Sequence, residues 1–107
     1  KSALMTVIKN QDHLDKSNAY FKNKCVEYNK RSPQKYMNYI DYGLSVVKNS
    51  IFFNFPTNKV FDLTEIFEDL SKNSLLAGFE IYDRFYEIGS VNGLNDTIEF
   101  FKKIDKE

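Results

Sequence analysis

The sequence has few of the features that mark specialised classes of protein. Its 107 residues contain one cysteine, Cys25, so no disulfide can form within the chain, as is typical of a reducing cytoplasm. Fifteen acidic and fifteen basic residues cancel, which leaves no overall field to attract nucleic acid or an anionic membrane. No apolar run approaches the roughly 20 residues that a membrane-spanning helix needs. We therefore expect a cytoplasmic protein with neither a nucleic-acid nor a membrane partner.

Several common chemical motifs are missing as well. There is no Cys/His cluster of the kind that binds zinc, and no glycine-rich phosphate loop. His13 is the only histidine and lies in a polar stretch, where a solvated side chain is expected rather than a catalytic one. Cys25 has no histidine nearby and is predicted to be a small packing residue. No catalytic residue is predicted in this chain.

What is present suits one globular domain over residues 1–107. Hydrophobic residues make up 42% of the chain and charged residues 28%, which is ordinary for a folded protein. A chain of this length can bury one modest core. There is no repeat, low-complexity stretch or internal linker, so a single unit is expected.

The first half reads as strands with one hairpin. The apolar residues 4–8 predict a buried strand, followed by a polar loop at 10–17. Residues 18–22 and 25–28 flank the turn pair Asn23-Lys24 and predict a hairpin. Residues 39–47 predict a strand in which Gly43 marks a bulge or a close approach. One or two helical turns are expected at residues 50–55, ended by Pro56.

The second half alternates helix and strand. Asp62 is expected to cap a helix, with Glu65 at capping-box spacing, and its apolar face follows the helical period. That face comprises Leu63, Ile66, Phe67 and Leu70. Residues 79–82 predict an edge strand and residues 85–88 a second extended piece, and Ser90 is expected to cap a helix to about residue 103 with Leu94, Ile98 and Phe101 on one face. The fold class predicted is α/β, with a mixed sheet, a hairpin and two main helices.

One junction has the pattern of a phosphate and metal site. In Glu87-Ile88-Gly89-Ser90 a carboxylate ends a predicted strand and is followed by a glycine and a helix-capping hydroxyl. Helix N-termini at the carboxyl ends of strands present unpaired N–H groups to anions. A carboxylate there can hold Mg²⁺ against a phosphate. Many strand–Gly–Ser–helix junctions bind nothing, so the pattern alone favours an ordinary junction.

Taken with its neighbours, this junction resembles a known family. The chain is similar to bacterial sugar-1-phosphate nucleotidyltransferases, especially the branch like mannose-1-phosphate guanylyltransferases. The similar stretches cover nearly the whole chain in order and spacing. They are Leu4-Met5-Thr6-Val7, Lys9-Asn10, Asp15-Lys16-Ser17-Asn18, Tyr39-Ile40-Asp41-Tyr42-Gly43-Leu44-Ser45-Val46, Phe61-Asp62-Leu63, Leu76-Ala77-Gly78-Phe79-Glu80, Arg84-Phe85-Tyr86-Glu87-Ile88-Gly89-Ser90 and Gly93-Leu94.

The resemblance implies a fold, a reaction and a position within a larger enzyme. The fold is a Rossmann-like nucleotidyltransferase domain, of which residues 1–107 correspond to the C-terminal, sugar-phosphate-binding side. In the reaction a sugar 1-phosphate attacks an NTP to give an NDP-sugar and pyrophosphate, with Mg²⁺ as cofactor. The nucleotide-binding N-terminal half is not in this sequence, so the piece alone is expected to be inactive and to pair with that half or with itself.

The resemblance also assigns roles to individual residues. Glu87 stands where relatives have the metal-binding Asp of an Asp-x-Gly-[ST] segment. Asp41 and Gly43 stand at the sugar-binding Asn-Ala-Gly of many relatives, so Asp41 is the expected sugar contact. Lys30 keeps the phosphate-contacting cation of a Glu-Lys-Pro segment.

A second hypothesis stays open. The chain could be a non-catalytic α/β interaction or regulatory module derived from the same ancestor. A Gly-Gly-x-x-[ST]-Arg loop about a hundred residues upstream would favour the enzyme, and a start codon at the first residue would favour the module.

Overall fold

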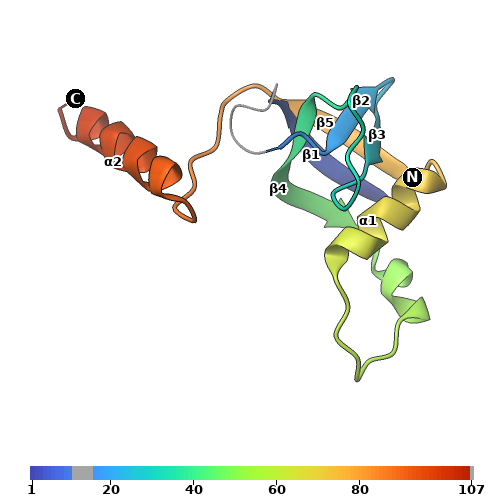
Figure 1. Cartoon of the computed structure of the whole chain (residues 1–107). Coiled ribbons are helices and arrows are strands. Elements are labelled where there is room, and N and C mark those ends of the chain that lie inside the picture. The colour runs from blue at the N-terminus through green and yellow to red at the C-terminus, as the bar shows by residue number, and fades with distance from the viewer. Residues whose placement is uncertain (11–15, 107) are drawn as a thin grey trace.

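A computed structural model of the chain describes residues 1–10 and 16–106. Four strands come first, and a short 3₁₀ helix, a helix, a fifth strand and a second helix follow them (Figure 1). The elements are β1 (Ala3–Lys9), β2 (Ala19–Lys22), β3 (Cys25–Tyr28), β4 (Tyr39–Val47), η1 (Asn49–Asn54), α1 (Leu63–Lys72), β5 (Leu76–Ile81) and α2 (Val91–Asp105).

The strands form a mixed sheet that closes into a barrel in the order β1-β4-β2-β3-β5. β1 pairs with two neighbours, antiparallel with β4 and parallel with β5. The short hairpin β2–β3 completes the barrel through two single pairings, Ala19 with Tyr39 and Cys25 with Ala77. The predicted α/β class, with a mixed sheet, a hairpin and two main helices, is confirmed. The open Rossmann-like sheet is not what forms, because the hairpin bridges β4 to β5.

A glycine permits this closure. A side-chain carbon at Gly78 would lie 2.5 Å from Val26 Cγ2 and 2.7 Å from the Phe21 ring. Because position 78 carries no side chain, β5 comes against the hairpin without displacing Val26 or Phe21. The core inside the barrel centres on Met5, Val7 and Leu76, which are fully buried.

Two local predictions for the strands are confirmed. Asn23 and Lys24 both have positive φ, 53° and 62°, as a two-residue hairpin turn with the twist of its strands requires. In β4 the register against β1 shifts between Met5 and Val7, and Gly43 has φ of 98°. Gly43 therefore marks a bulge; nothing lies within 4 Å of where its side chain would be, so the alternative of a close approach does not apply.

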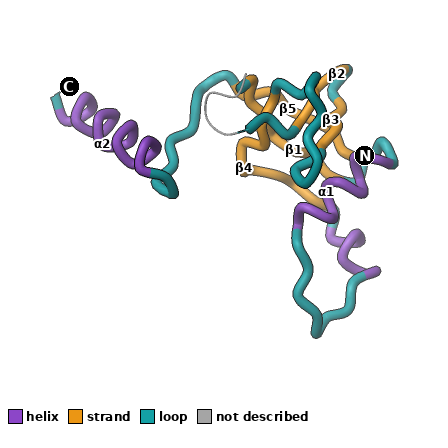
Figure 2. The backbone as a smooth tube through the Cα atoms, in the orientation of Figure 1, coloured by secondary structure: helices purple, strands orange, loops and turns teal. Residues whose placement is uncertain are grey.

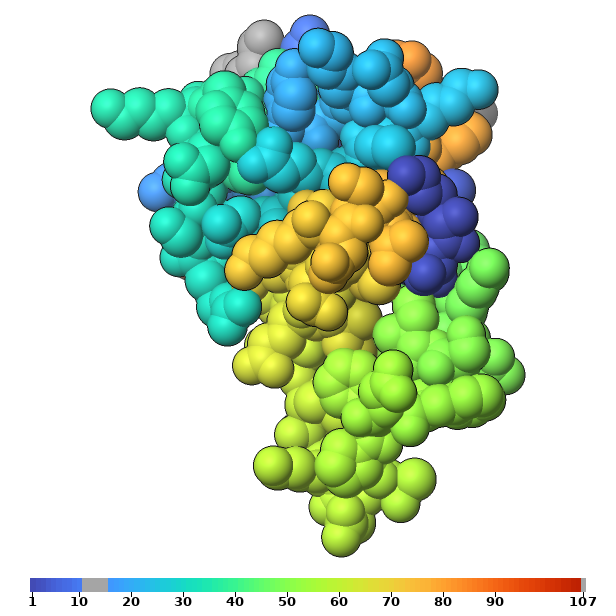
Figure 3. Space-filling model, turned by 90° about the vertical axis from the view of Figure 1, so that its right-hand side faces the viewer, coloured from blue at the N-terminus to red at the C-terminus, as the bar shows by residue number. Residues whose placement is uncertain are grey.

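Helix α1 covers one face of the barrel (Figures 2 and 3). Ile66, Phe67 and Leu70 are buried against the core, as the helical period predicted, whereas Leu63 is half exposed. Asp62 caps the helix, but its carboxylate accepts from the Thr64 N–H at 2.9 Å. The cap was predicted; the capping-box pairing with Glu65 is not the contact that Asp62 makes.

In the second half one strand prediction is right only in part and another is wrong. The strand expected at residues 79–82 begins earlier, at Leu76, and is not an edge, because β5 runs beside β1 and meets β3. Residues 85–88 are unpaired and join no sheet. Phe85 and Tyr86 instead contact aromatic rings on β4 and α2, at Tyr42 and Phe100.

Helix α2 stands away from the barrel (Figure 1). Ser90 caps it as predicted, its hydroxyl accepting from the Gly93 N–H at 3.0 Å. None of its residues is buried. The radius of gyration is 15.8 Å, against about 13 Å for a compact domain of this length. The second helix therefore adds length to the molecule rather than core.

Candidate functional site

Three of the four residues assigned from the sequence line one cleft. Lys30, Asp41 and Glu87 come from the end of the hairpin, from β4 and from the segment before α2. The cleft has a volume of about 490 Å³, and Asn18, Tyr28, Ile40, Phe85, Gly89 and Ser90 complete its lining. It holds a cation, two carboxylates and aromatic walls. We take this cleft as the candidate site.

Asp41 is half-buried and held by the backbone around the β4 bulge. Its Oδ1 accepts from the Gly43 N–H at 2.9 Å, and its own N–H donates to Asn18 Oδ1 at 3.3 Å. Burial raises the pKa of Asp41, although the Gly43 N–H and the Lys30 ammonium act to lower it. A half-buried carboxylate that has one oxygen engaged can offer the other to a ligand hydroxyl.

Gly43 does not line the cleft but shapes it. Its positive φ, which other residues adopt at a cost, turns its N–H back onto Asp41. The residue predicted as a sugar contact thus acts through Asp41, by fixing which way that carboxylate points.

Lys30 lies on the loop that follows the hairpin, and its position is set by its backbone. The Lys30 N–H donates to Glu68 Oε1 on α1 at 3.1 Å, and the preceding Asn29 N–H donates to the Asn18 carbonyl at 2.9 Å. The side chain is exposed. An exposed ammonium beside a half-buried carboxylate suits a phosphate that carries sugar hydroxyls.

Two kinds of contact place Glu87 at the cleft: an aromatic contact of the neighbouring Phe85, and hydrogen bonds to the residues that begin α2. Phe85 meets Tyr42 of β4 edge-to-face at 5.6 Å, which brings the segment against the barrel. The Glu87 carboxylate then accepts from the Ser90 hydroxyl at 2.7 Å and from the Gly89 N–H at 2.6 Å. These two hydrogen bonds lower the pKa of Glu87, so the group is ionised at neutral pH.

The two carboxylates in the cleft could supply only part of the ligands that a hard divalent cation needs. Mg²⁺ is commonly held by one or two protein carboxylates, with phosphate and water supplying the remaining oxygens. Glu87 is ionised, and each of its oxygens accepts one hydrogen bond, which leaves further lone pairs. Within residues 1–10 and 16–106, no group of three or more His, Cys, Asp or Glu side chains gathers as a metal cage would require.

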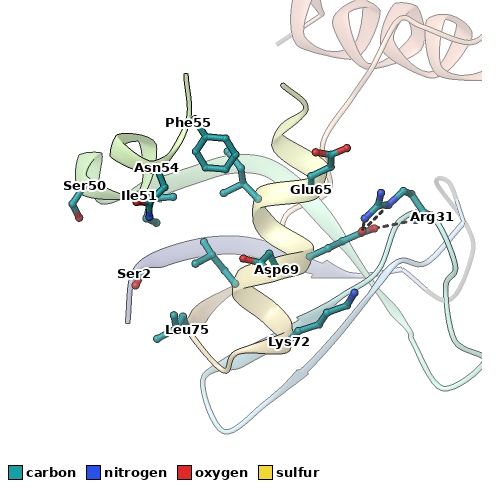
Figure 4. A pocket seen from close by; sticks show the side chains of 13 residues that line it. Ser2, Arg31, Ser50, Ile51, Asn54, Phe55, Glu65, Asp69, Lys72 and Leu75 are labelled. Carbon is teal, nitrogen blue, oxygen red and sulfur yellow. Dashed lines mark hydrogen bonds and ion pairs between the residues drawn. The ribbon is translucent and has the colours of Figure 1, made fainter. Parts of the chain in front are cut away.

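A larger cavity, of about 690 Å³, lies between η1 and α1 (Figure 4). Its walls mix aliphatic side chains with Glu65, Glu68 and Asp69 of α1. Glu68 is 3% exposed, and its carboxylate forms an ion pair with Arg31, whose Nε donates to it at 2.7 Å. None of the sequence-predicted residues lines this cavity, and we assign it no ligand.

Sequence reasoning missed part of the cleft. Asn18 belongs to a stretch that resembles the family, and its place just before a strand opposite Asp41 was the available signal. Tyr28 and Phe85 gave none, because an aromatic side chain that lines a cleft and one that fills a core look alike in sequence. His13 and most of the polar loop predicted at 10–17 lie outside the described residues.

Comparisons with known proteins add no family assignment. No protein-family model matches the chain, and no curated protein matches it either. In the described residues, no helix has the length and apolar character to cross a lipid bilayer.

Proposed function

We propose that the cleft binds a sugar 1-phosphate and that the chain is the acceptor-binding part of a sugar-1-phosphate nucleotidyltransferase. The observation that carries the proposal is that Lys30, Asp41 and Glu87 line one cleft. The resemblance assigned each of them a ligand separately, and 57 positions of sequence separate the first from the last (87 − 30). The product would be an NDP-sugar for surface polysaccharide synthesis, made in the cytoplasm.

Each side chain would contribute a different part of the recognition. Lys30 would pair with the phosphate, because an ammonium is the strongest donor along the cleft. Asp41 would accept from sugar hydroxyls. In the reaction a phosphate oxygen of the sugar 1-phosphate forms a bond to the α-phosphorus of the NTP, and the bond to pyrophosphate breaks. Lys30 and Asp41 would hold the nucleophile in place for that displacement.

Glu87 would hold Mg²⁺ in the complete enzyme. A bound Mg²⁺ would neutralise phosphate charge as it builds up. Glu87 also closes the N-terminus of α2, so its carboxylate would be shared between the cap and the metal. Among the described strands, β1 and β5 form the one parallel pair. The further parallel strands of a Rossmann-like sheet would come from the nucleotide-binding half of the enzyme.

Calorimetric titration of the chain with mannose 1-phosphate and with inorganic phosphate tests the binding roles. We expect Lys30→Gln to weaken both ligands about tenfold, since it removes a charge-assisted contact. Asp41→Ala should weaken the sugar phosphate and leave inorganic phosphate unchanged. Lys35→Gln, which removes an exposed lysine from the same loop, is the matched control. Equal affinities for Lys30→Gln and Lys35→Gln would refute the assignment.

The metal role has a separate test. Mg²⁺ should tighten binding of the sugar phosphate in the wild-type chain and have no effect on Glu87→Gln. Ser90→Ala breaks the hydroxyl contact to Glu87 but keeps the carboxylate, so it should retain the Mg²⁺ effect. If Ser90→Ala loses the effect as fully as Glu87→Gln, the helix cap and not the metal explains it.

The second candidate is a non-catalytic interaction module. It is favoured by α2, whose apolar residues lie exposed on one side. Absence of binding by any sugar 1-phosphate, together with capture of a partner that depends on α2, would favour this candidate over the enzyme.

A further inference from the structure

A buried carboxylate on α1 holds the loop that carries Lys30. Glu68 is 3% exposed, although glutamate is almost never buried without partners. Its Oε1 accepts from the backbone N–H groups of Lys30 at 3.1 Å and of Arg31 at 3.2 Å. Its Oε2 accepts from the Arg31 guanidinium, with Nε at 2.7 Å. Dashed lines mark this contact at the labelled Arg31 in Figure 4. One side chain thus fixes two successive peptide units of the loop.

This contact leaves little freedom to the peptide of Lys30. On its N-terminal side the loop is tied to the sheet, where the Asn29 N–H donates to the Asn18 carbonyl at 2.9 Å. On its C-terminal side Asn29 Oδ1 accepts from the Ser32 N–H at 2.9 Å. Between these two hydrogen bonds, Glu68 joins the loop to α1. The same α1 is anchored in the core through Ile66, Phe67 and Leu70.

Lys30 lines the cleft, whereas Glu68 and Arg31 line the separate cavity between η1 and α1. Glu68 therefore does not line the proposed binding site. It can influence a ligand there only through the backbone of the residue that does.

We infer that Glu68 is a positioning residue, which sets where the Lys30 ammonium stands in the cleft by holding the Lys30 and Arg31 amides. The inference rests on the proposed binding of a sugar 1-phosphate. Electrostatics agrees: burial acts to raise the pKa of Glu68, but the Arg31 guanidinium and the two amides outweigh it and lower the pKa, so the contact is made by a carboxylate. A charged acceptor is what makes such hydrogen bonds strong.

The experiment compares Glu68→Gln with Asp69→Asn, the same carboxylate-to-amide change at the exposed neighbouring position. Amide hydrogen exchange of the whole chain is followed by NMR at Lys30 and Arg31, with Val7 in β1 as the reference for the fold. We expect exchange at Lys30 and Arg31 to speed up about tenfold in Glu68→Gln, as loss of hydrogen bonds to a charged acceptor implies. Val7 should keep its protection, and Asp69→Asn should behave as the wild type.

Binding of mannose 1-phosphate supplies the second readout, in a double-mutant cycle. Glu68→Gln should weaken binding several-fold in the wild-type background and have no further effect in a Lys30→Gln background. A purely structural role would lower affinity in both backgrounds alike, and that result would overturn the inference. So would unchanged exchange at Lys30 and Arg31.

The two proposals fail in different ways. If the wild-type chain binds no mannose 1-phosphate while exchange at Lys30 responds to Glu68→Gln, the proposed function is overturned and the loop contact stands without a ligand role. If the chain binds the ligand and Lys30 matters but Glu68 does not, the proposed function stands and the inference is overturned.

Discussion

Single residues at the cleft serve both the fold and the proposed ligand. Asp41 accepts from the Gly43 amide at the bulge, and Glu87 accepts from the hydroxyl that caps α2. Each carboxylate is therefore oriented by a nearby N–H or O–H before any ligand arrives. Such orientation lowers the entropy that binding must lose. It also means that a substitution at either position has a structural effect that must be measured separately.

The raised pKa of Asp41 makes a prediction about stability and pH. Burial raises the pKa above its ordinary 3.8, so the folded chain holds the proton more tightly than the unfolded chain. The contribution of Asp41 to stability is therefore greatest below its ordinary pKa and falls as pH rises through the raised value. Asp41→Asn keeps an acceptor for Gly43 and removes the charge.

We expect Asp41→Asn to be more stable than the wild type at neutral pH, with the difference shrinking as the pH falls toward 3.8. Urea unfolding across this range measures it. A difference that does not change with pH would contradict the burial of the charged form.

Gly93 is predicted to be required for the cap of α2. A side-chain carbon there would lie 1.8 Å from Glu87 Oε1 and 2.6 Å from the Glu87 carbonyl oxygen. Alanine normally favours a helix over glycine by about 1 kcal/mol. Gly93→Ala should nevertheless loosen the first turn of α2, seen as lost amide protection by NMR. Asn92→Ala, one residue earlier, should leave this protection unchanged. Equal protection in the two variants would show that Glu87 can move aside without loosening the helix.

At the scale of elements, what the sequence predicts well is what local chemistry decides. The hairpin turn at Asn23-Lys24, the bulge at Gly43 and the caps at Asp62 and Ser90 depend on neighbours within a few residues. What it misses depends on distant partners. The first residue of β5 could not be predicted because pairing with β1 determines where the strand begins. Residues 85–88 alternate like a strand, yet they pair with none of the described strands.

Barrel closure is the clearest of these non-local effects, and it leads to a prediction at Gly78. The missing side chain lets β5 meet Val26 and Phe21 of the hairpin. Gly78→Ala should destabilise the chain by about 1–3 kcal/mol, the usual range for overpacking a buried contact. Urea unfolding followed by circular dichroism gives the value. Gly89→Ala, outside the barrel, should leave the urea midpoint of unfolding unchanged. If Gly78→Ala has the same midpoint, β5 and the hairpin can separate enough to accept a methyl group without cost.

At the scale of the whole molecule, the barrel and α1 enclose a buried core, whereas no residue of α2 is buried. Val91, Leu94, Ile98, Phe101 and Ile104 recur at helical spacing and are 42–75% exposed. The sequence predicted that Leu94, Ile98 and Phe101 share one face of the helix; no residue of α2 is buried in the structure. An apolar stripe of this kind favours association.

We therefore expect the chain to self-associate through α2 at high concentration. Ile98→Lys should shift it toward monomer in light scattering after size exclusion. Asn92→Lys adds the same charge on the side of the helix away from Leu94 and Ile98, and it should leave association unchanged. A wild-type chain that is monomeric at high concentration would contradict this expectation.

The candidate site shows the same division between local and distant signals. Lys30, Asp41 and Glu87 were each predicted from short stretches, and they line one cleft. How they are held was not predictable, because Glu68 lies 38 positions after Lys30 and Phe85 meets Tyr42 across 43 positions (68 − 30 and 85 − 42). Residue identity suggested the ligand chemistry, and only the fold supplies the contacts that orient it.

Binding of a phosphorylated sugar in this cleft can be followed by NMR titration of the wild-type chain. With mannose 1-phosphate we expect saturable shifts at Lys30, at Asp41 with Gly43, and at Glu87. Inorganic phosphate should shift Lys30 but not Asp41. Shifts confined to the cavity between η1 and α1, or no saturable shift with any sugar 1-phosphate, would contradict binding in this cleft.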